Sequence, residues 1–293
     1  MIAETTLGAL AGLGAAMTWA ATSLLVRSLV PDLSSVAVNA VRSTVGGAIL
    51  LVWVLVTAGA GAFTAVSPRA LGLLALSIVA AIAIGDTAFF ESTRALGVGR
   101  AMTVSMTYPV GAAALAAAFL EEPVTPPIAV GTLLTLAGLV LIVAPWAERA
   151  PGERFAFGVG TATLASLAWA VSVIFLKAPL RETDPVTAQA IRLPLAALVL
   201  WATPWARAAA GGLGRLEGAA ITRLAALSVL TVLSSVLFVA SVKYAGVAAA
   251  AVLSSTAPMF AIPLARFFFG ERLSRPALVG AGITVVGIVV LRL

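Results

Sequence analysis

The stretch that decides the fold runs from Gly158 to Arg192 and reads GVGTATLASLAWAVSVIFLKAPLRETDPVTAQAIR. It repeats, at a constant offset of 150 residues, the earlier stretch from Gly8 to Arg42, which reads GALAGLGAAMTWAATSLLVRSLVPDLSSVAVNAVR. The matched pairs include identities and chemically similar residues: Trp19 and Trp169, Ala20 and Ala170, Val36 and Val186, Asn39 and Gln189, Arg42 and Arg192. The chain therefore contains an internal repeat of one sequence unit.

The match continues beyond this stretch at an offset of 149, because one residue has been lost. The pairs at this offset are mostly structural residues: Gly97 and Gly246, Pro109 and Pro258, Glu122 and Glu271, Gly131 and Gly280, Gly138 and Gly287. We therefore expect two units, residues 1–150 and residues 151–293.

The composition is that of an integral membrane protein. Hydrophobic residues make up 61% of the chain and charged residues only 10%, and the mean hydropathy is +1.10, well beyond the apolar content of a soluble domain. The net charge of +6 is scattered singly between apolar runs, which indicates membrane-flanking charge and not nucleic-acid binding. The chain has no cysteine and no histidine, so the usual thiolate and imidazole chemistry is absent. We expect no metal and no cofactor.

Apolar runs of the length that crosses a bilayer as a helix, about 20 residues, divide the chain into about ten spans. They lie approximately over 7–29, 36–58, 71–92, 101–120, 127–146, 158–179, 187–204, 222–242, 248–269 and 276–291. No run shows the alternation of a membrane β-barrel, so the sequence predicts an all-α membrane protein. Each copy holds five spans, an odd number, and the second copy must enter the membrane from the opposite side. Such inverted repeats recur in secondary transporters.

The loop charges predict an orientation. Arginines are more numerous in the loops that follow odd-numbered spans than on the other side. Taken literally, the positive-inside rule then puts both termini outside.

Two arginines lie some six residues inside their spans, where a charge is costly and often functional. Asn39 precedes Arg42 by three residues, as Gln189 precedes Arg192, so each amide shares a helix face with its guanidinium. One interpretation is two polar faces that look into a central cavity. The other is that each arginine snorkels, or pairs with the acid ten residues before it.

Aromatic residues near mid-span are not interface anchors. Trp19 and Ser23 lie in one helical row, and Trp169 is the copy of Trp19. The tryptophans either stack on an amphipathic solute or fill space between helices. Tyr108 adds an aromatic hydroxyl that has no copy, since Ala257 stands at the equivalent position.

The third span contains an acid without a counterpart. Asp86 is copied as Ser235, so whatever Asp86 does breaks the two-fold symmetry. It could take up a proton or a sodium ion, or it could neutralise Arg42. We retain both a coupling and a structural role.

Two prolines lie inside apolar spans, Pro109 in the fourth and Pro258 in the ninth. Each removes a backbone hydrogen bond and kinks its helix. A kink at membrane depth either borders a cavity, where it can act as a hinge, or serves helix packing alone.

Paired glycines mark the fifth and tenth spans. Gly131 and Gly138 lie seven residues apart, as do Gly280 and Gly287, so each pair falls on one helix face and permits close approach of another helix. We expect these two spans to be packing helices without contact to a substrate.

Several function classes lack their motifs. The chain has no phosphate-binding G-x-x-x-x-G-K-[ST] loop, no H-E-x-x-H and no G-x-S-x-G. We therefore expect neither ATP hydrolysis nor an enzyme.

At these residues the chain resembles the EamA family of the drug/metabolite transporter superfamily. The resemblance rests on the two five-span repeats, Gly-Asp-x-x-Phe-Phe at 85–90, the mid-span prolines, and Glu122 and Glu271 ahead of a glycine-rich span. It implies a ten-helix basket whose cavity is lined by the first four helices of each half. It also implies termini in the cytoplasm, which conflicts with the loop charges.

The resemblance implies export or uptake of amino acids and other metabolites. Relatives that carry phosphorylated solutes use several lysines and arginines in the cavity, and this sparse interior points away from polyanions. We expect a secondary transporter of amino acids or similar amphipathic solutes, working as an exporter in a bacterial inner membrane. The alternative is a lipid-handling or structural membrane protein.

The site is expected near the bilayer midplane, where inverted repeats face each other. The residues expected to bind the solute are Trp19, Ser23, Asn39, Arg42, Tyr108, Trp169, Gln189 and Arg192. The expected partners are a small solute and membrane lipid, with no nucleic acid and no ATP, and the protein is expected to be a monomer or a homodimer.

Overall fold

The structure, a computed structural model, describes residues 2–29, 33–96, 98–143, 154–214, 216–260, 264 and 275–290. The first half contains α1 (Ile2–Leu29), α2 (Ser35–Thr57), α3 (Gly61–Thr64), α4 (Pro68–Ile78), η1 (Val79–Asp86), α5 (Thr87–Leu96), α6 (Val98–Ser105), α7 (Tyr108–Leu120) and α8 (Pro126–Val143). The second half contains α9 (Phe155–Lys177), η2 (Pro179–Arg181), α10 (Pro185–Ala202), α11 (Pro204–Leu213), α12 (Gly218–Ala245), α13 (Val247–Ser254) and α15 (Arg275–Val290). The described ranges contain no strand.

Within the described residues, each of the ten predicted spans contains helix, which confirms the fold class. Six are long and apolar enough to cross a membrane unaided. The other four are shorter apolar helices, two of them in the fourth and ninth spans, where the helix is interrupted. The short helices α3 and α11 were not predicted, because neither has the length of a span.

Side-chain caps fix where several helices begin. Ser34 accepts a hydrogen bond from Ala37 N, Ser67 from Ala70 N, Asp184 from Thr187 N and Thr203 from Ala206 N. Each bond satisfies a backbone N–H that the first turn leaves without a partner. Helices α4, α10 and α11 each have a proline at their first position, where its missing N–H costs nothing. These polar starts therefore mark the ends of apolar spans.

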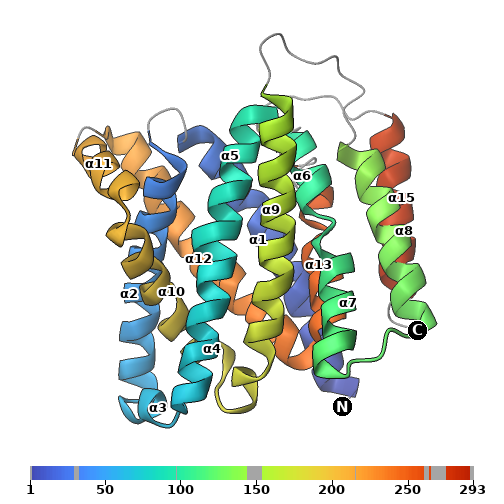
Figure 1. Cartoon of the computed structure of the whole chain (residues 1–293), viewed down its shortest axis with the longest axis horizontal. Coiled ribbons are helices and arrows are strands. Elements are labelled where there is room, and N and C mark those ends of the chain that lie inside the picture. Colours follow the sequence, from blue (N-terminus) through green and yellow to red (C-terminus); the bar gives the residue numbers. More distant parts are fainter. Residues whose placement is uncertain are drawn as a thin grey trace.

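The two halves pack against each other throughout the bundle (Figure 1). Helix α1 packs on α12, α2 on α10, and α9 on η1, α4, α5 and α7. Many core residues are alanines, which allow helix backbones to approach closely. The start of α1 and the end of α15 lie at the same end of the bundle, as an even number of crossings requires.

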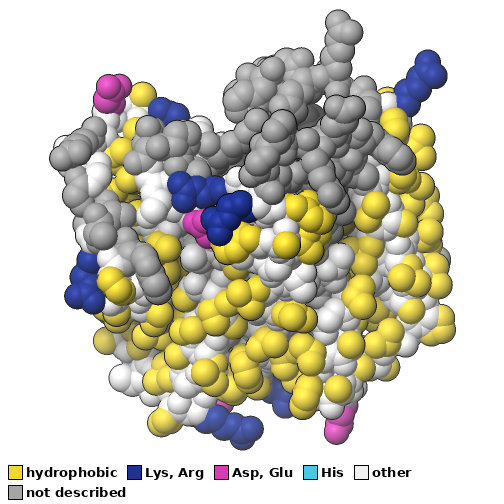
Figure 2. Space-filling model, turned by 45° about the horizontal axis from the view of Figure 1, so that its top comes forward, with side chains coloured by type: hydrophobic (Ala, Val, Ile, Leu, Met, Phe, Trp, Pro, Cys, Tyr) yellow, Lys and Arg dark blue, Asp and Glu magenta, His cyan; other side chains and the backbone are white. Residues whose placement is uncertain are grey.

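The outer surface has the character of a membrane-embedded face. In Figure 2 a broad band of hydrophobic side chains covers the flank, and the charged side chains lie above and below it. Large hydrophobic side chains that are exposed on the membrane-spanning helices include Val56, Leu133 and Leu198. This arrangement suits a multi-pass protein whose flank faces lipid.

Helices α8 and α15 pack on each other at one side of the bundle (Figure 1). A Cβ added to Gly138 would collide with Thr284 and the backbone of Gly280, and one added to Gly287 would lie 2.5 Å from Thr135 N. The glycines therefore let the two backbones touch, which confirms that these helices pack on each other; that they do not contact a substrate stays a prediction.

We expect Gly287→Ala to lower the stability of the protein in detergent by about 1–3 kcal/mol, because the methyl group must push two helix backbones apart. Thermal unfolding of the purified protein measures the change. Gly282→Ala on the same helix is the matched control, since nothing lies within 4 Å of its added Cβ. Equal stability of the two variants would contradict the close approach.

Candidate functional site

The third span contains a π-helix between α4 and α5. This segment, η1, covers the eight residues Val79–Asp86, and π-helical turns are rare and often occur at functional sites. The indole of Trp169 packs on it, and its Nε1 donates to Ala81 O at 3.2 Å. A Cβ on Gly85 would lie 2.6 Å from this indole, so only glycine allows the contact. The π-helix ends at Asp86, which is buried.

The fourth and ninth spans are both interrupted next to a proline. Helix α6 ends at Ser105 and α7 begins at Tyr108; α13 ends at Ser254, and the helix resumes just before Pro258. The predicted kinks are therefore helix breaks, and the hinge role of Pro109 and Pro258 stays a prediction. The Tyr108 and Ser254 hydroxyls lie 2.5 Å apart, so a hydrogen bond joins the two breaks across the halves.

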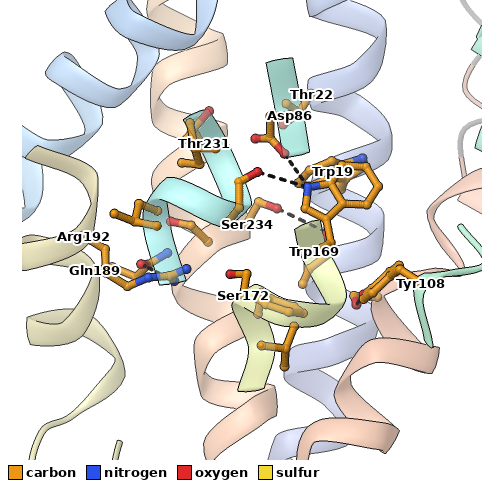
Figure 3. Close-up of a pocket in the computed structure, with 18 of the residues that line it drawn as sticks. Trp19, Thr22, Asp86, Tyr108, Trp169, Ser172, Gln189, Arg192, Thr231 and Ser234 are labelled. Carbon is orange, nitrogen blue, oxygen red and sulfur yellow. Dashed lines mark hydrogen bonds between the residues drawn. The ribbon is translucent and has the colours of Figure 1, made fainter. Parts of the chain in front are cut away.

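A cavity lies between the halves at the level of these breaks (Figure 3). Its volume is about 110 Å³, counted as space that the centre of a water molecule can occupy. One water needs only some 10–15 Å³ by this measure, so there is room for a small solute. Residues of the π-helix and residues at both helix breaks line this cavity. The full lining is Ala15, Trp19, Thr22, Arg42, Ile78, Ala81, Ile82, Asp86, Met106, Tyr108, Trp169, Ser172, Val173, Gln189, Arg192, Thr231, Ser234, Ser235, Phe238 and Ser254.

Arg42 forms a buried ion pair with Asp86, in which Nη2 donates to Oδ2. The side chain of Asn39 orients the guanidinium by accepting from its Nε at 2.7 Å. Trp169 Nε1 also donates to the other carboxylate oxygen, Oδ1, at 2.9 Å. Of the roles expected for Asp86, the structure shows one, the neutralisation of Arg42.

Arg192 has a different environment, although it is the copy of Arg42. Its Nη1 donates to Gln189 Oε1 at 2.8 Å and its Nη2 to Ser77 Oγ at 2.9 Å. Among the described residues, no carboxylate lies within 4.0 Å of this guanidinium. The side chain is 2% exposed. The direct hydrogen-bond partners of Arg192 are therefore polar but neutral, and Asp86 acts on its charge only from beyond contact distance.

In the second half, Arg192 does not pair with Glu182, the acid ten residues before it, as one of the alternatives had predicted. Glu182 accepts instead from Ser67 N at 3.0 Å, in the loop region. Hydrogen bonds from Ser67 lower the pKa of Glu182 below its ordinary value. In the first half the equivalent acid, Asp32, lies outside the described residues.

Trp169 is the centre of an aromatic cluster. Its ring centroid lies 5.7 Å from that of Trp19 and 5.8 Å from that of Tyr108, both edge to face. Phe89 lies 5.4 Å away on another side. In Figure 3 the rings of Trp19, Tyr108 and Trp169 stand on one side of the cavity, and Arg192 and Gln189 on the other. The cavity thus has an apolar wall and a polar wall.

Three lining residues have buried polar atoms without a hydrogen-bond partner among the described residues. They are Trp19 Nε1, Thr22 Oγ1 and Arg192 Nε. Buried polar groups are nearly always paired, and these three atoms belong to residues that line one cavity.

Six of the eight predicted binding residues line this cavity. Ser23 does not, since its hydroxyl bonds to Trp19 O at 3.0 Å in its own helix, and its neighbour Thr22 lines the cavity instead. Asn39 lies behind Arg42 and bonds to Thr87. The lining residues that sequence reasoning missed are apolar residues and residues with a hydroxyl group, such as Ser172, Thr231 and Ser234. Thr231 and Ser234 lie three residues apart in the eighth span and so share a helix face, which is the signal that could have found them.

The fold and the cavity define a class: a multi-pass membrane protein with a solute-sized cavity between two matching halves, the architecture of secondary transporters. The chain belongs to the EamA-like transporter family, whose model matches residues 6–144 and again residues 156–293. The resemblance inferred from the sequence is therefore confirmed. The protein is a transporter of small solutes, and its family is not one of enzymes.

Comparison with solved structures supports the same fold. One crystal structure aligns with a TM-score of 0.77, at 19% sequence identity, and covers 97% of this chain and 95% of its own. No curated protein matches the chain.

We expect Arg42→Met alone to destabilise the protein by about 3–5 kcal/mol, because it leaves the Asp86 carboxylate buried without its partner. Adding Asp86→Leu should recover most of the loss, since the lone charge is then gone. Thermal unfolding of the two single variants and the double variant in detergent forms a double-mutant cycle. Additive losses would show that the pair is not coupled.

Proposed function

We propose that this protein is a secondary transporter of small amphipathic solutes, a class that includes amino acids. The observation that supports this most directly is the cavity between the halves, with aromatic rings on one wall and a buried guanidinium on the other. A solute with an apolar body and a polar group can contact both walls at once. We further propose that it works as an exporter in a bacterial inner membrane, as a monomer or a homodimer.

The proposed site assigns a role to each wall. Trp19 and Trp169 contact the apolar body, and Gln189 and Arg192 contact the polar group. Tyr108 makes the pocket asymmetric, because Ala257 occupies the equivalent position in the other half. An asymmetric pocket suits an asymmetric solute.

Alternating access is proposed to proceed at the two helix breaks. No regular helix crosses residues 106–107 or 255–256, so the segments on either side can tilt with little loss of backbone hydrogen bonding. The Tyr108–Ser254 hydrogen bond is a contact that such a tilt would exchange. Pro109 and Pro258 keep the breaks in place because neither can complete the helix.

Flux into liposomes that contain the purified protein tests the proposal. We expect saturable flux of at least one amino acid or related amphiphile, and its absence across a broad set would contradict transport. Trp19→Ala should weaken solute binding by about 1–3 kcal/mol, the value of a lost aromatic contact. Trp53→Ala is the matched control, since Trp53 is 60% exposed on the outer face of α2. Equal effects of both substitutions would place the site elsewhere.

A second prediction concerns coupling to an ion gradient. If Asp86 binds and releases a proton during transport, Asp86→Asn should abolish gradient-driven accumulation and leave equilibrative exchange in the protein that still folds with Arg42 unpaired, because the amide keeps the shape but cannot ionise. Counterflow with and without an imposed pH gradient separates the two. Uphill transport that persists in Asp86→Asn would show that Asp86 serves only to neutralise Arg42.

A further inference from the structure

The charges that line the cavity do not cancel. Among the described lining residues, the acidic and basic side chains are Arg42, Asp86 and Arg192. Two cations and one anion leave a surplus of one positive charge. Burying an isolated charge is costly unless another charge pairs with it, so the surplus defines a requirement for the ligand.

The one anion is already engaged. Asp86 Oδ2 accepts from Arg42, and Oδ1 accepts from Trp169 Nε1 at 2.9 Å. Its charge is balanced within the protein, and both oxygens have close donors. A solute ammonium group would find no unbalanced carboxylate among the described lining residues.

The surplus charge lies on Arg192. A guanidinium has five N–H donors in a planar fork, and the described residues accept from only two of its nitrogens, Nη1 and Nη2. Its Nε has no partner, and neither has Trp19 Nε1 on the other wall. Both groups can only donate, so a ligand must supply acceptors. A carboxylate does so, and it matches the fork of an arginine bidentately.

We propose that the site selects an amphipathic monoanion, a solute with one carboxylate, an apolar or aromatic body and no ammonium group. This rests on the proposed function, in that the cavity is taken to be the transport site. A zwitterion such as a free amino acid would bring a cation into a cavity where Asp86, the one acid among the described lining residues, is already paired with Arg42. The ammonium group would then lose its hydration without gaining a counter-charge. A dianion would leave one of its own charges unbalanced.

Three probes with the same phenyl ring and carbon chain separate the charge states. They are 3-phenylpropionate, a monoanion; phenylalanine, which adds only the ammonium group; and 3-phenylpropanamide, a neutral analogue. Calorimetric titration of the detergent-solubilised protein measures their binding. We expect 3-phenylpropionate to bind at least about tenfold more tightly than either of the others, the scale of one charge-assisted hydrogen bond.

Arg192→Gln should remove the preference of the site for the monoanion over the amide, and Arg192→Lys should retain it, because lysine keeps the charge. If Arg192→Gln fails to fold, the ratios measured on the unaltered protein decide the question by themselves. Equal binding of phenylalanine and 3-phenylpropionate overturns the inference, as does equal binding of the amide or no binding of any of the three.

The failure of this inference can be told from the failure of the proposed function. Saturable flux of phenylalanine that equals or exceeds that of 3-phenylpropionate overturns the monoanion preference and leaves a transporter of amphipathic solutes. Absence of flux for every solute in the broad set overturns transport itself.

Discussion

A guanidinium buried in the middle of a membrane protein must be neutralised or held by several acceptors, because lipid and apolar side chains offer it nothing. Arg42 meets this constraint through Asp86, and much of the surrounding structure keeps that carboxylate in place. The π-helix η1 ends at Asp86, Trp169 donates to it, and Gly85 leaves room for the indole. A change at any of these positions disturbs the ion pair, so the third span, the second span and α9 form one unit around it.

The duplicated sequence supplies the same arginine twice but the acid only once. Arg192 stands where the repeat requires it, and Gln189 supports it as Asn39 supports Arg42. The position equivalent to Asp86 is Ser235, whose Oγ bonds to Val232 O and cannot neutralise a charge. Because only one half carries this carboxylate, Arg42 has an acid in direct contact and Arg192, among the described residues, does not. Symmetry of the backbone favours two exchangeable conformations, and asymmetry of the side chains allows recognition of one kind of solute.

Hydropathy and the repeat were enough to predict the ten spans, because span length is set by the membrane and repeats preserve it. The pairing of Asp86 with Arg42 was one of two alternatives that the sequence left open. The π-helix was not predictable, since a shift of hydrogen bonding by one residue has no signature in residue type. The direction in which each side chain points was harder to predict than the position of the spans. Thr22 lines the cavity and the adjacent Ser23 does not. Neighbouring residues in a helix point about 100° apart, and the packing of the helix, which the sequence does not show, fixes its rotation.

The periphery and the centre of the bundle are built for opposite purposes. At the periphery α8 and α15 touch through glycines, where even a methyl group would collide with backbone, so this pair resists sliding. At the centre the fourth and ninth spans are broken, and a single hydroxyl contact between Tyr108 and Ser254 joins the breaks. Weak polar contacts can be exchanged for similar ones at little cost, whereas interlocked backbones cannot. Motion that opens the cavity is therefore expected to concentrate at the breaks, next to the aromatic wall, and a solute that touches Trp169 would also lie beside Tyr108, the first residue after one break.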